Sequence, residues 1–314
     1  MSIRTDLHTQ EGIQTYAAGM NASVSDKAKI LPYIKPGNIL EIGCGNGTVL
    51  ELISEAFPTS NVYGVDMSAQ LLGLAAQRKY DGPVQLYCCD AKKLRSIDGA
   101  PRKFSTIIFC SVLHEIFSGY LARSVEDNPI EDAFRDTMDF VAHFCEEYLE
   151  EGGRLIIRDG VRPKPEMIYV EIDTPEQRDT FFRFVDDFTP FKIEFSYSSV
   201  TNKIKMPSTH LFEFLTKYFY EKNWNIEVTE QFGWADPDSI AEYLQDYFEG
   251  DAEMTMQTVE GWSYTLEFLR NKWTGDFTLT DMDGQEYTPK STMMYVAEKV
   301  SLWAENPPGL TKSF

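Results

Sequence analysis

The 314-residue chain has few of the residues that build disulfide-rich or zinc-binding domains. It holds five cysteines, at positions 44, 88, 89, 110 and 145, and no pair has the C-x-x-C spacing of a zinc site. Most lie in apolar segments, which is typical of buried reduced thiols. The pair His114-Glu115 begins like H-E-x-x-H but lacks the second histidine. We therefore expect neither a disulfide framework nor a bound metal.

Long apolar runs and basic residues are also scarce. No stretch of about 18 apolar residues occurs, and the N-terminus lacks a charged segment followed by an apolar one, so neither a membrane span nor a signal peptide is predicted. The chain has 29 Lys and Arg against 49 Asp and Glu, a net charge of −20. Such a surface repels phosphate, which disfavours nucleic acid as a partner. We expect a soluble cytoplasmic protein.

No Gly/Ser-rich or Pro-rich linker divides the chain, and it contains no internal repeat. Hydrophobic residues make up 43% and aromatic residues 13%, enough for a large core. We expect one domain over residues 1–314. Its expected parts are an N-terminal helical cap (1–36), a ligand-binding core (37–160), an insertion (161–206) and a C-terminal completion of the sheet (207–314).

The most informative stretch is ILEIGCGNG, from Ile39 to Gly47. An apolar strand leads into three alternate glycines and then into a helical pattern from Thr48. Glycine has no Cβ and tolerates positive φ, so this turn brings backbone close to a ligand. The spacing G-x-G-x-G differs from the dinucleotide pattern G-x-G-x-x-G. The stretch therefore predicts a site for a nucleotide-like ligand.

Four further apolar strands follow, separated by helical stretches and ending in polar residues. They are predicted over 61–66, 84–90, 104–110 and 149–159, and the polar residues at their ends are Asp66, Asp90, Ser111, Arg158 and Asp159. Strands that alternate with helices predict an α/β protein with a parallel sheet covered on both faces. Such sheets bind ligands at the carboxyl ends of their strands, where Asp66 can accept hydrogen bonds from both hydroxyls of a ribose.

The insertion after the fifth strand is expected to form a β-α-β unit. Residues 167–172 and 192–197 have strand patterns, and between them Thr174 and Gln177 form a capping box with Pro175 at the first helical position. At the ligand edge this unit can serve as a substrate lid or as a dimer contact, and the sequence does not choose between them.

The C-terminal part is predicted to complete the sheet. A helix over 208–222, a sixth strand over 224–232 and a last strand over 293–300 are expected. The segment 235–290 is a second insertion, with the following predicted elements: a helix from Asp236 to near Gly250, a helix carrying Trp262, Leu266, Leu269 and Trp273, and a hairpin turn at Asp283-Gly284.

In order and spacing these motifs resemble the class I S-adenosylmethionine-dependent methyltransferases, over roughly residues 35–160. The resemblance is carried by Glu41-Ile42-Gly43-Cys44-Gly45-Asn46-Gly47, Asp66, Asp90, Ser111-Val112-Leu113-His114-Glu115 and Glu151-Gly152-Gly153. It implies a Rossmann-like, seven-stranded, mostly parallel sheet with an antiparallel last strand, and S-adenosylmethionine as cofactor.

The resemblance also implies a set of cofactor contacts. The residues are Glu41, Gly43, Cys44, Gly45, Gly47, Asp66, Met67, Asp90, Ala91 and Ser111. Asp66 would hold the ribose, Asp90 the adenine amino group and the Ser111 backbone the ammonium group, while Glu41 would orient loop amides or the ammonium. Alternatively, Asp66 or Asp90 only caps the helix that follows it.

In the resembling family the N-terminal region often closes over the methionine end of the cofactor. Tyr16 and Lys27 lie in this region here. The alternative is an amphipathic packing helix with an exposed lysine.

The candidate catalytic residues are His114, Arg158 and Asp159. A neutral His114 can take a proton from an attacking hydroxyl, amine or acid. Its alternative role is structural, in orienting a helix or bonding to backbone. Arg158 can hold a substrate carboxylate or simply pair with Asp159.

Two absent motifs narrow the substrate. No Asn/Asp-Pro-Pro-Tyr/Phe motif follows the fourth strand, and no set of carboxylates plus Asn suggests a divalent metal. We therefore expect metal-independent methyl transfer to a small molecule or peptide side chain, and the sequence also allows a homodimer. The alternatives are a cofactor-binding, non-catalytic partner subunit and a nicotinamide-dependent oxidoreductase, which would lack the antiparallel last strand.

Overall fold

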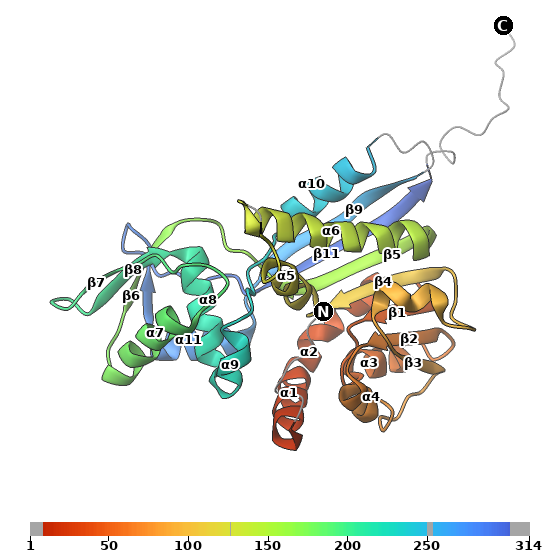
Figure 1. The fold of residues 1–314 in the computed structure, drawn as a ribbon, viewed down its shortest axis with the longest axis horizontal. Coiled ribbons are helices and arrows are strands. Elements are labelled where there is room, and N and C mark those ends of the chain that lie inside the picture. The colour runs from red at the N-terminus through yellow and green to blue at the C-terminus, as the bar shows by residue number, and fades with distance from the viewer. Residues whose placement is uncertain (1–8, 126, 250–253, 302–314) are drawn as a thin grey trace, which may run out of the picture.

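A computed structural model describes residues 9–125, 127–249 and 254–301 (Figure 1). Its main sheet has seven strands in the order β3-β2-β1-β4-β5-β11-β9. The strands are β1 (Asn38–Ile42), β2 (Asn61–Asp66), β3 (Val84–Cys88), β4 (Phe104–Cys110), β5 (Leu149–Gly160), β9 (Met254–Tyr264) and β11 (Thr292–Ser301). The strands from β3 to β5 pair in parallel, and β11 runs antiparallel to both of its neighbours. The predicted fold class is confirmed.

Helices cover both faces of this sheet because successive side chains of each buried strand point to opposite sides. On β1, for example, Ile39 and Leu40 belong to two different hydrophobic clusters. One face is covered by η2 (Ala28–Tyr33), α3 (Thr48–Ala56) and α4 (Ala69–Ala75), and the other by η3 (Ala91–Ser96), α5 (Leu113–Leu121), α6 (Pro129–Tyr148) and α10 (Pro237–Tyr247).

A second unit, which we call the lid, lies beside the carboxyl edge of the main sheet (Figure 1). It comprises an antiparallel sheet in the order β10-β6-β8-β7 and the helices packed on it. Its elements are β6 (Met167–Glu171), α7 (Pro175–Asp187), β7 (Ser196–Ser198), β8 (Lys203–Pro207), α8 (Ser208–Phe219), η4 (Glu221–Asn223), α9 (Trp224–Glu227), α11 (Glu267–Asp276) and β10 (Thr278–Thr280). An aromatic-rich core of its own, which includes Phe181, Phe214 and Trp273, holds it together.

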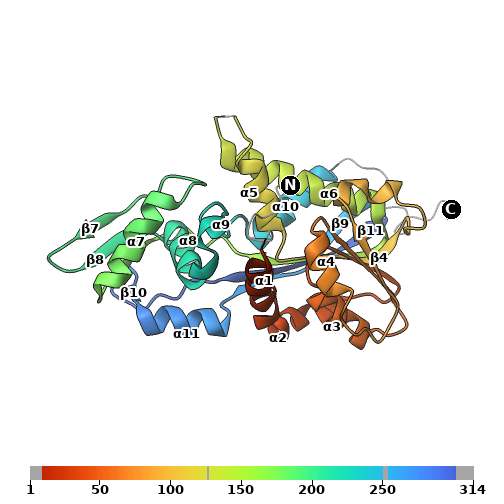
Figure 2. The same cartoon turned by 60° about the horizontal axis from the view of Figure 1, so that its bottom comes forward.

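The lid is built from two separate stretches of chain, one after β5 and one between β9 and β11. The helix α1 (Gln10–Ala22) lies between the lid and the main sheet in both views and contacts η4 on one side and α4 on the other (Figures 1 and 2). The short helix α2 (Val24–Lys27) follows it. The N-terminal segment therefore bridges the two units.

The predicted sixth strand over 224–232 is wrong. Residues 224–227 form α9, in which Val228 N donates to Trp224 O at 3.0 Å, and the sheet's sixth strand is β9. Trp224 packs inside the lid against α7. Its Nε1 donates to Asp187 at 2.7 Å, and the Arg183 guanidinium lies 4.2 Å from its ring centroid. A short alternating pattern fits a helical turn as well as a strand, and the lid contacts select the turn.

Two other predicted elements are shorter than expected. In the segment 192–197 only the last residues enter a strand, β7, which pairs with β8. Trp262 lies on β9 and not in the helix with Leu269 and Trp273, because its ring packs against Tyr33 at a centroid distance of 5.7 Å. The capping box of α7 and the turn at Gly284, with φ of +78°, are confirmed.

The C-terminal end of the 20-residue α6 is hydrogen-bonded by a buried lysine from β11. Lys299 Nζ donates to the carbonyls of Cys145, Glu146 and Leu149, each at 3.0 Å. A cation at this end also complements the helix dipole. Although α6 is long, its exposed face is strongly charged, and within the described ranges no helix is long and apolar enough to cross a membrane.

Replacing Lys299 by Met is expected to lower the free energy of unfolding by about 2 kcal/mol, because buried carbonyls lose a charged donor. Lys103→Met is the matched control, since the exposed Lys103 donates to a single carbonyl of the described residues, Glu146 O, at 3.3 Å; it should cost less than about 0.5 kcal/mol. Urea unfolding of both variants checks this, and equal losses would contradict it.

Candidate active site

A cavity of about 900 Å³ is lined by the carboxyl edge of the main sheet, by α1 and by the lid. Figure 2 shows how these three parts are arranged, with α1 between the other two. The main sheet and its loops contribute Gly43, Gly45, Asp66, Met67, Ala91, Ser111, His114, Arg158 and Asp159. The lid contributes aromatic side chains, among them Phe212, Phe219 and Tyr220, together with polar and charged ones such as Glu221 and Lys272. The cavity thus has the glycine turn and the strand-end polar groups on the sheet side, and aromatic rings mixed with charged groups on the lid side.

The glycine turn after β1 has the backbone that its sequence predicted. Gly43 and Gly45 have φ of +74° and +51°, and both line the cavity. A Cβ at Gly43 would lie 2.4 Å from Val112 Cγ2, and one at Gly45 would lie 2.2 Å from Met20 Cε. Both the positive φ and the close approach of Val112 and of α1 therefore require glycine.

Two other residues of the turn lie away from the cavity lining. Gly47 begins α3 and packs against Tyr80 and Ala75. Cys44 is buried against Gly64 in the core beneath the turn, and burial holds the pKa of its thiol well above the usual value. Their predicted cofactor contacts stay predictions, and the structure gives them a packing role.

Asp66 lies at the junction of β2 and the glycine turn. Its Oδ2 accepts from Gly45 N and its Oδ1 from Ser68 N, both at 2.8 Å. Burial raises the pKa of this carboxyl, although the backbone donors oppose that effect. Asp66 therefore holds the turn in shape and at the same time lines the cavity beside Met67.

Asp90 mainly caps a helix, the alternative that the sequence left open. Its carboxylate accepts from Lys92 N at 3.0 Å at the start of η3. Its neighbours Cys89 and Ala91 line the cavity, whereas Asp90 is not among the lining residues of the described chain. An adenine contact for Asp90 stays a prediction.

Glu41 is buried beneath the turn, and Lys27 reaches the same region from α2. In the described structure the Glu41 Oε2 atom has no hydrogen-bond partner. Burial raises the pKa of Glu41 well above its usual value, and the positive charge of Lys27 acts against this. Lys27 lines the cavity and donates to Met20 O at 3.1 Å, so it is not exposed; the Tyr16 side chain falls outside the described part.

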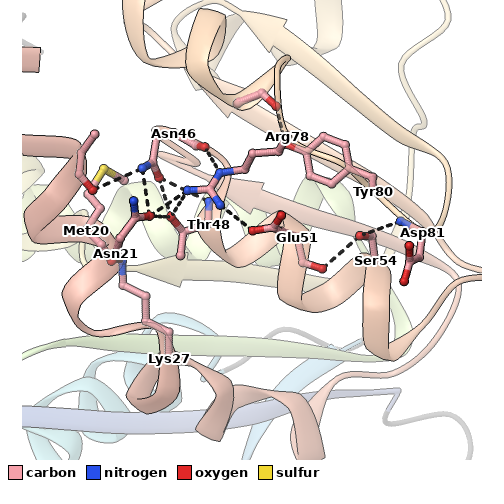
Figure 3. Close-up of polar contacts among 12 residues, drawn as sticks. Met20, Asn21, Lys27, Asn46, Thr48, Glu51, Ser54, Arg78, Tyr80 and Asp81 are labelled. Carbon is pink, nitrogen blue, oxygen red and sulfur yellow. Dashed lines mark hydrogen bonds and ion pairs between the residues drawn. The ribbon is translucent and has the colours of Figure 1, made fainter. Parts of the chain in front are cut away.

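Arg78, which the sequence did not single out, fastens α1 to the glycine turn (Figure 3). Its Nε donates to Asn46 O at 2.5 Å, and its Nη2 donates to Asn21 Oδ1 at 2.7 Å and Thr48 Oγ1 at 2.9 Å. Its Nη1 pairs with Glu51 at 2.5 Å. No local motif marks Arg78, because it follows α4 and meets its partners only in the folded chain.

Arg158 and Ser111 form a second polar connection at the cavity floor. Ser111 has φ of +58°, and its Oγ accepts from Arg158 Nη1 at 2.8 Å. Arg158 Nε donates to Asp26 at 2.9 Å, and Tyr264 donates to the same carboxylate at 2.9 Å. The predicted alternative of an Arg158–Asp159 pair is therefore replaced by an Arg158–Asp26 pair, which ties α2 to the sheet.

Asp159 instead pairs with His114. Their Oδ1 and Nδ1 atoms lie 2.6 Å apart, and Oδ2 accepts from the backbone N–H groups of Val112, Leu113 and His114 at 3.1, 2.7 and 3.3 Å. One carboxylate thus caps α5 and orients the ring. Burial opposes a charged imidazole, but the Asp159 charge outweighs it and raises the pKa of His114 to about 9. At neutral pH His114 is the cationic half of an ion pair.

Two carboxylates near His114 were not among the predicted site residues. Ligand atoms of His114, Glu115 and Glu230 lie within 4.8 Å of one another. Glu115 belongs to the motif Ser111-Val112-Leu113-His114-Glu115, which carries the resemblance. Glu230 lies in the segment 224–232, which was wrongly predicted to be a strand. Imidazole and carboxylate are donor types that divalent transition metals accept. The expected absence of a metal stays a prediction.

Comparisons with known proteins agree with this geometry. Residues 40–155 match the family model for a methyltransferase domain. Over 58 residues the chain is 36% identical to malonyl-[acyl-carrier protein] O-methyltransferase of Anoxybacillus flavithermus, covering 18% of this chain and 22% of that protein. Over 135 residues it is 27% identical to a ubiquinone/menaquinone biosynthesis C-methyltransferase of Desulfotalea psychrophila, covering 42% and 45%. The chain thus matches less than half the length of each of these relatives.

A similar solved structure is the plantazolicin methyltransferase BpumL in complex with a triazolic desmethylPZN analog and SAH. The match covers 94% of this chain and 93% of the BpumL chain, with 12% sequence identity and a TM-score of 0.45.

The strand order and the glycine turn define a Rossmann-like protein. Its sheet contains the antiparallel last strand that a nicotinamide-dependent oxidoreductase was expected to lack. The family match over residues 40–155 and the sheet order agree with the class I S-adenosylmethionine-dependent methyltransferases that the sequence resembles, whose cofactor is S-adenosylmethionine. The resemblance found in the sequence is confirmed.

Replacing Asp159 by Asn is expected to lower the pKa of His114 from about 9 towards its ordinary value, because the main charge that opposes burial is lost while Glu115 and Glu230 remain. NMR titration of the histidine rings measures this. The exposed His143 serves as an internal control and should not shift. A His114 pKa that stays near 9 in the variant would contradict the assignment.

The same pair predicts how stability depends on pH. The pKa of His114 is raised in the folded state, so its stabilisation is complete below 6.5 and is lost as the pH rises through about 9. Urea unfolding at pH 6 and pH 9.5 should show a larger loss for the wild type than for Asp159→Asn. Equal losses would show that the pair does not contribute.

Proposed function

We propose that this protein transfers the methyl group of S-adenosylmethionine to a small molecule or a peptide side chain. One observation carries the proposal: the glycine turn with Asp66 and the lid's aromatic wall open into the same cavity, with His114 lining it as well. A methyl donor on the sheet side and an acceptor on the lid side would meet there. On this proposal the main sheet and the lid act as one functional unit over 1–314.

The sheet side of the cavity suits a cationic sulfonium compound. S-adenosylmethionine supplies the reactive methyl group itself when bound, so the protein needs to bind it, orient it and exclude water. Asp66 accepts from the ribose hydroxyls, and Gly43 and Gly45 leave room for close backbone contact. The buried Glu41 Oε2 atom, which has no hydrogen-bond partner in the described structure, supports a role towards the ammonium group, together with the Ser111 backbone. Lys27 lies beside them and would bind the carboxylate of the cofactor's methionine part.

The lid half is proposed to hold the acceptor. Two residues of the predicted insertion, Glu176 and Thr180, line the cavity, which supports a lid in preference to a dimer contact for this segment. His114 enters as an ion pair with Asp159, so its first role is to present a fixed, charged ring at the transfer site. Proton removal by His114 requires that the ring first become neutral.

Titration calorimetry with S-adenosylmethionine is expected to show one site, and Asp66→Asn should weaken it about tenfold by removing a charged acceptor. Asp136→Ala, an exposed change on α6, is the control and should leave the dissociation constant unchanged. Circular dichroism verifies that each variant folds. No binding by the folded wild type would overturn the proposal, and an unchanged constant for Asp66→Asn would refute the ribose role.

Transfer of label from methyl-labelled S-adenosylmethionine to a metabolite or peptide pool tests the activity itself. Labelled product is expected with the wild type and not with Gly45→Val, because valine disfavours the φ of +51° at this position and its Cβ would lie 2.2 Å from Met20 Cε. Binding without transfer to any pool would favour the non-catalytic partner subunit.

A further inference from the structure

A fully buried ion pair lies in the lid, away from the residues assigned above. Glu213 and Lys217 stand one turn apart on α8, their charged atoms lie 2.7 Å apart, and their exposed fractions are 1% and 0%. Taking two charges out of water costs free energy that apolar residues of similar size would avoid. Stability alone is therefore a weak reason for such a pair, and its other contacts indicate what it does.

Both members of the pair hold Phe232. Glu213 Oε2 accepts from Phe232 N at 3.0 Å, and Oε1 accepts from Gly233 N at 2.7 Å. Lys217 Nζ lies 4.3 Å from the centroid of the Phe232 ring, a cation–π contact. The backbone and the ring of this residue are thus fixed from the same side, by α8.

The opposite side of the same segment is attached to the main unit. Gln231 N donates to Ser118 Oγ at 2.9 Å, and that hydroxyl donates to His114 O at 2.7 Å. A Cβ at Gly160, next to Asp159, would lie only 2.4 Å from Phe232 O. The 230–233 segment is therefore the place where the lid, α5 and the end of β5 meet.

Phe232 itself covers the His114 ring. The two ring centroids lie 4.4 Å apart at 31°, and Tyr220 stacks on Phe232 at 6.0 Å and 23°. All three rings line the cavity. His114 is consequently held between Asp159, which bonds its Nδ1, and Phe232, which packs on its ring.

We propose that Phe232 is a wall of the methyl-transfer site and that Glu213 is its positioning residue, coupling the seating of the lid to the orientation of His114. This inference rests on the proposed function. Glu213 acts through the backbone of Phe232 and Gly233, so its two acceptor oxygens matter more than its charge. Loss of those acceptors lets Phe232 leave the His114 ring and misaligns the acceptor half of the site, while the cofactor half, on Gly43 to Asp66, is unaffected.

Two double variants separate acceptors from charge. Glu213→Gln with Lys217→Met removes both charges and keeps one of the two acceptor oxygens, with an NH2 group in place of the other; Glu213→Leu with Lys217→Met removes both acceptors. The first readout is the His114 ring signal in NMR spectra of the cofactor-free protein, which the Phe232 ring current shifts. We expect the Leu/Met protein to move towards the shift of an exposed histidine and the Gln/Met protein, which keeps one acceptor, to stay closer to the wild-type shift.

The second readout is kinetic. The Leu/Met protein should lose kcat on the order of ten- to hundredfold, as misplaced reacting groups do, with an unchanged dissociation constant for S-adenosylmethionine. Phe232→Leu should reproduce both effects if the Leu/Met protein does not fold, and Phe214→Leu, in the lid core away from the cavity, is its matched control.

Each outcome decides the proposal. The proposal is overturned if Phe232→Leu keeps both the wild-type His114 shift and the wild-type kcat. It is also overturned if a weaker affinity for the cofactor accounts for the whole loss of activity. If the His114 shift moves as expected while no variant, wild type included, transfers a methyl group, the positioning role stands and the proposed function fails.

Discussion

The bonds made by the Asp159 carboxylate are the constraint on which the rest of the site depends. At the end of β5 it accepts from three successive amides at the start of α5 and from the His114 ring. These bonds set the turn that follows β4, and with it the position of Val112 against Gly43 and of His114 against Phe232. A carboxylate at a helix N-terminus is stabilised by the orphan amides and the helix dipole, so it stays ionised although buried.

Several buried charges in and near the cavity are matched by a partner from another element or from the next helical turn. The pairs are Arg158 with Asp26, His114 with Asp159 and Lys217 with Glu213, and Lys27 acts on Glu41 through its field. A buried charge is costly unless it is paired and hydrogen-bonded, so these pairs permit only a few arrangements of α2, β5 and the lid. The acidic chain thus places several of its scarce bases where they order the site.

Sequence patterns predicted the first five strands and the glycine turn because both depend on local chemistry. Buried parallel strands are continuous apolar runs, and Gly43 and Gly45 adopt a backbone that other residues rarely do. The sixth strand was misplaced for the opposite reason. The edge strand β9 is largely exposed, so its apolar signal is weak, whereas Trp224, Val228 and Phe232 give the segment 224–232 an alternating pattern although they pack in the lid.

By itself the sequence determined the α/β class, the carboxyl edge as the ligand edge, and the glycines and acids that shape it, since each follows from the period of a strand or from the φ that a residue tolerates. Only the tertiary structure decided the partners: Arg158 with Asp26, His114 with Asp159, Arg78 with the glycine turn, and Glu213 with Phe232. These partners are separated by between 19 and 132 positions in the chain. Which distant charges meet depends on how the sheet, α1 and the lid pack, and no local pattern records that packing.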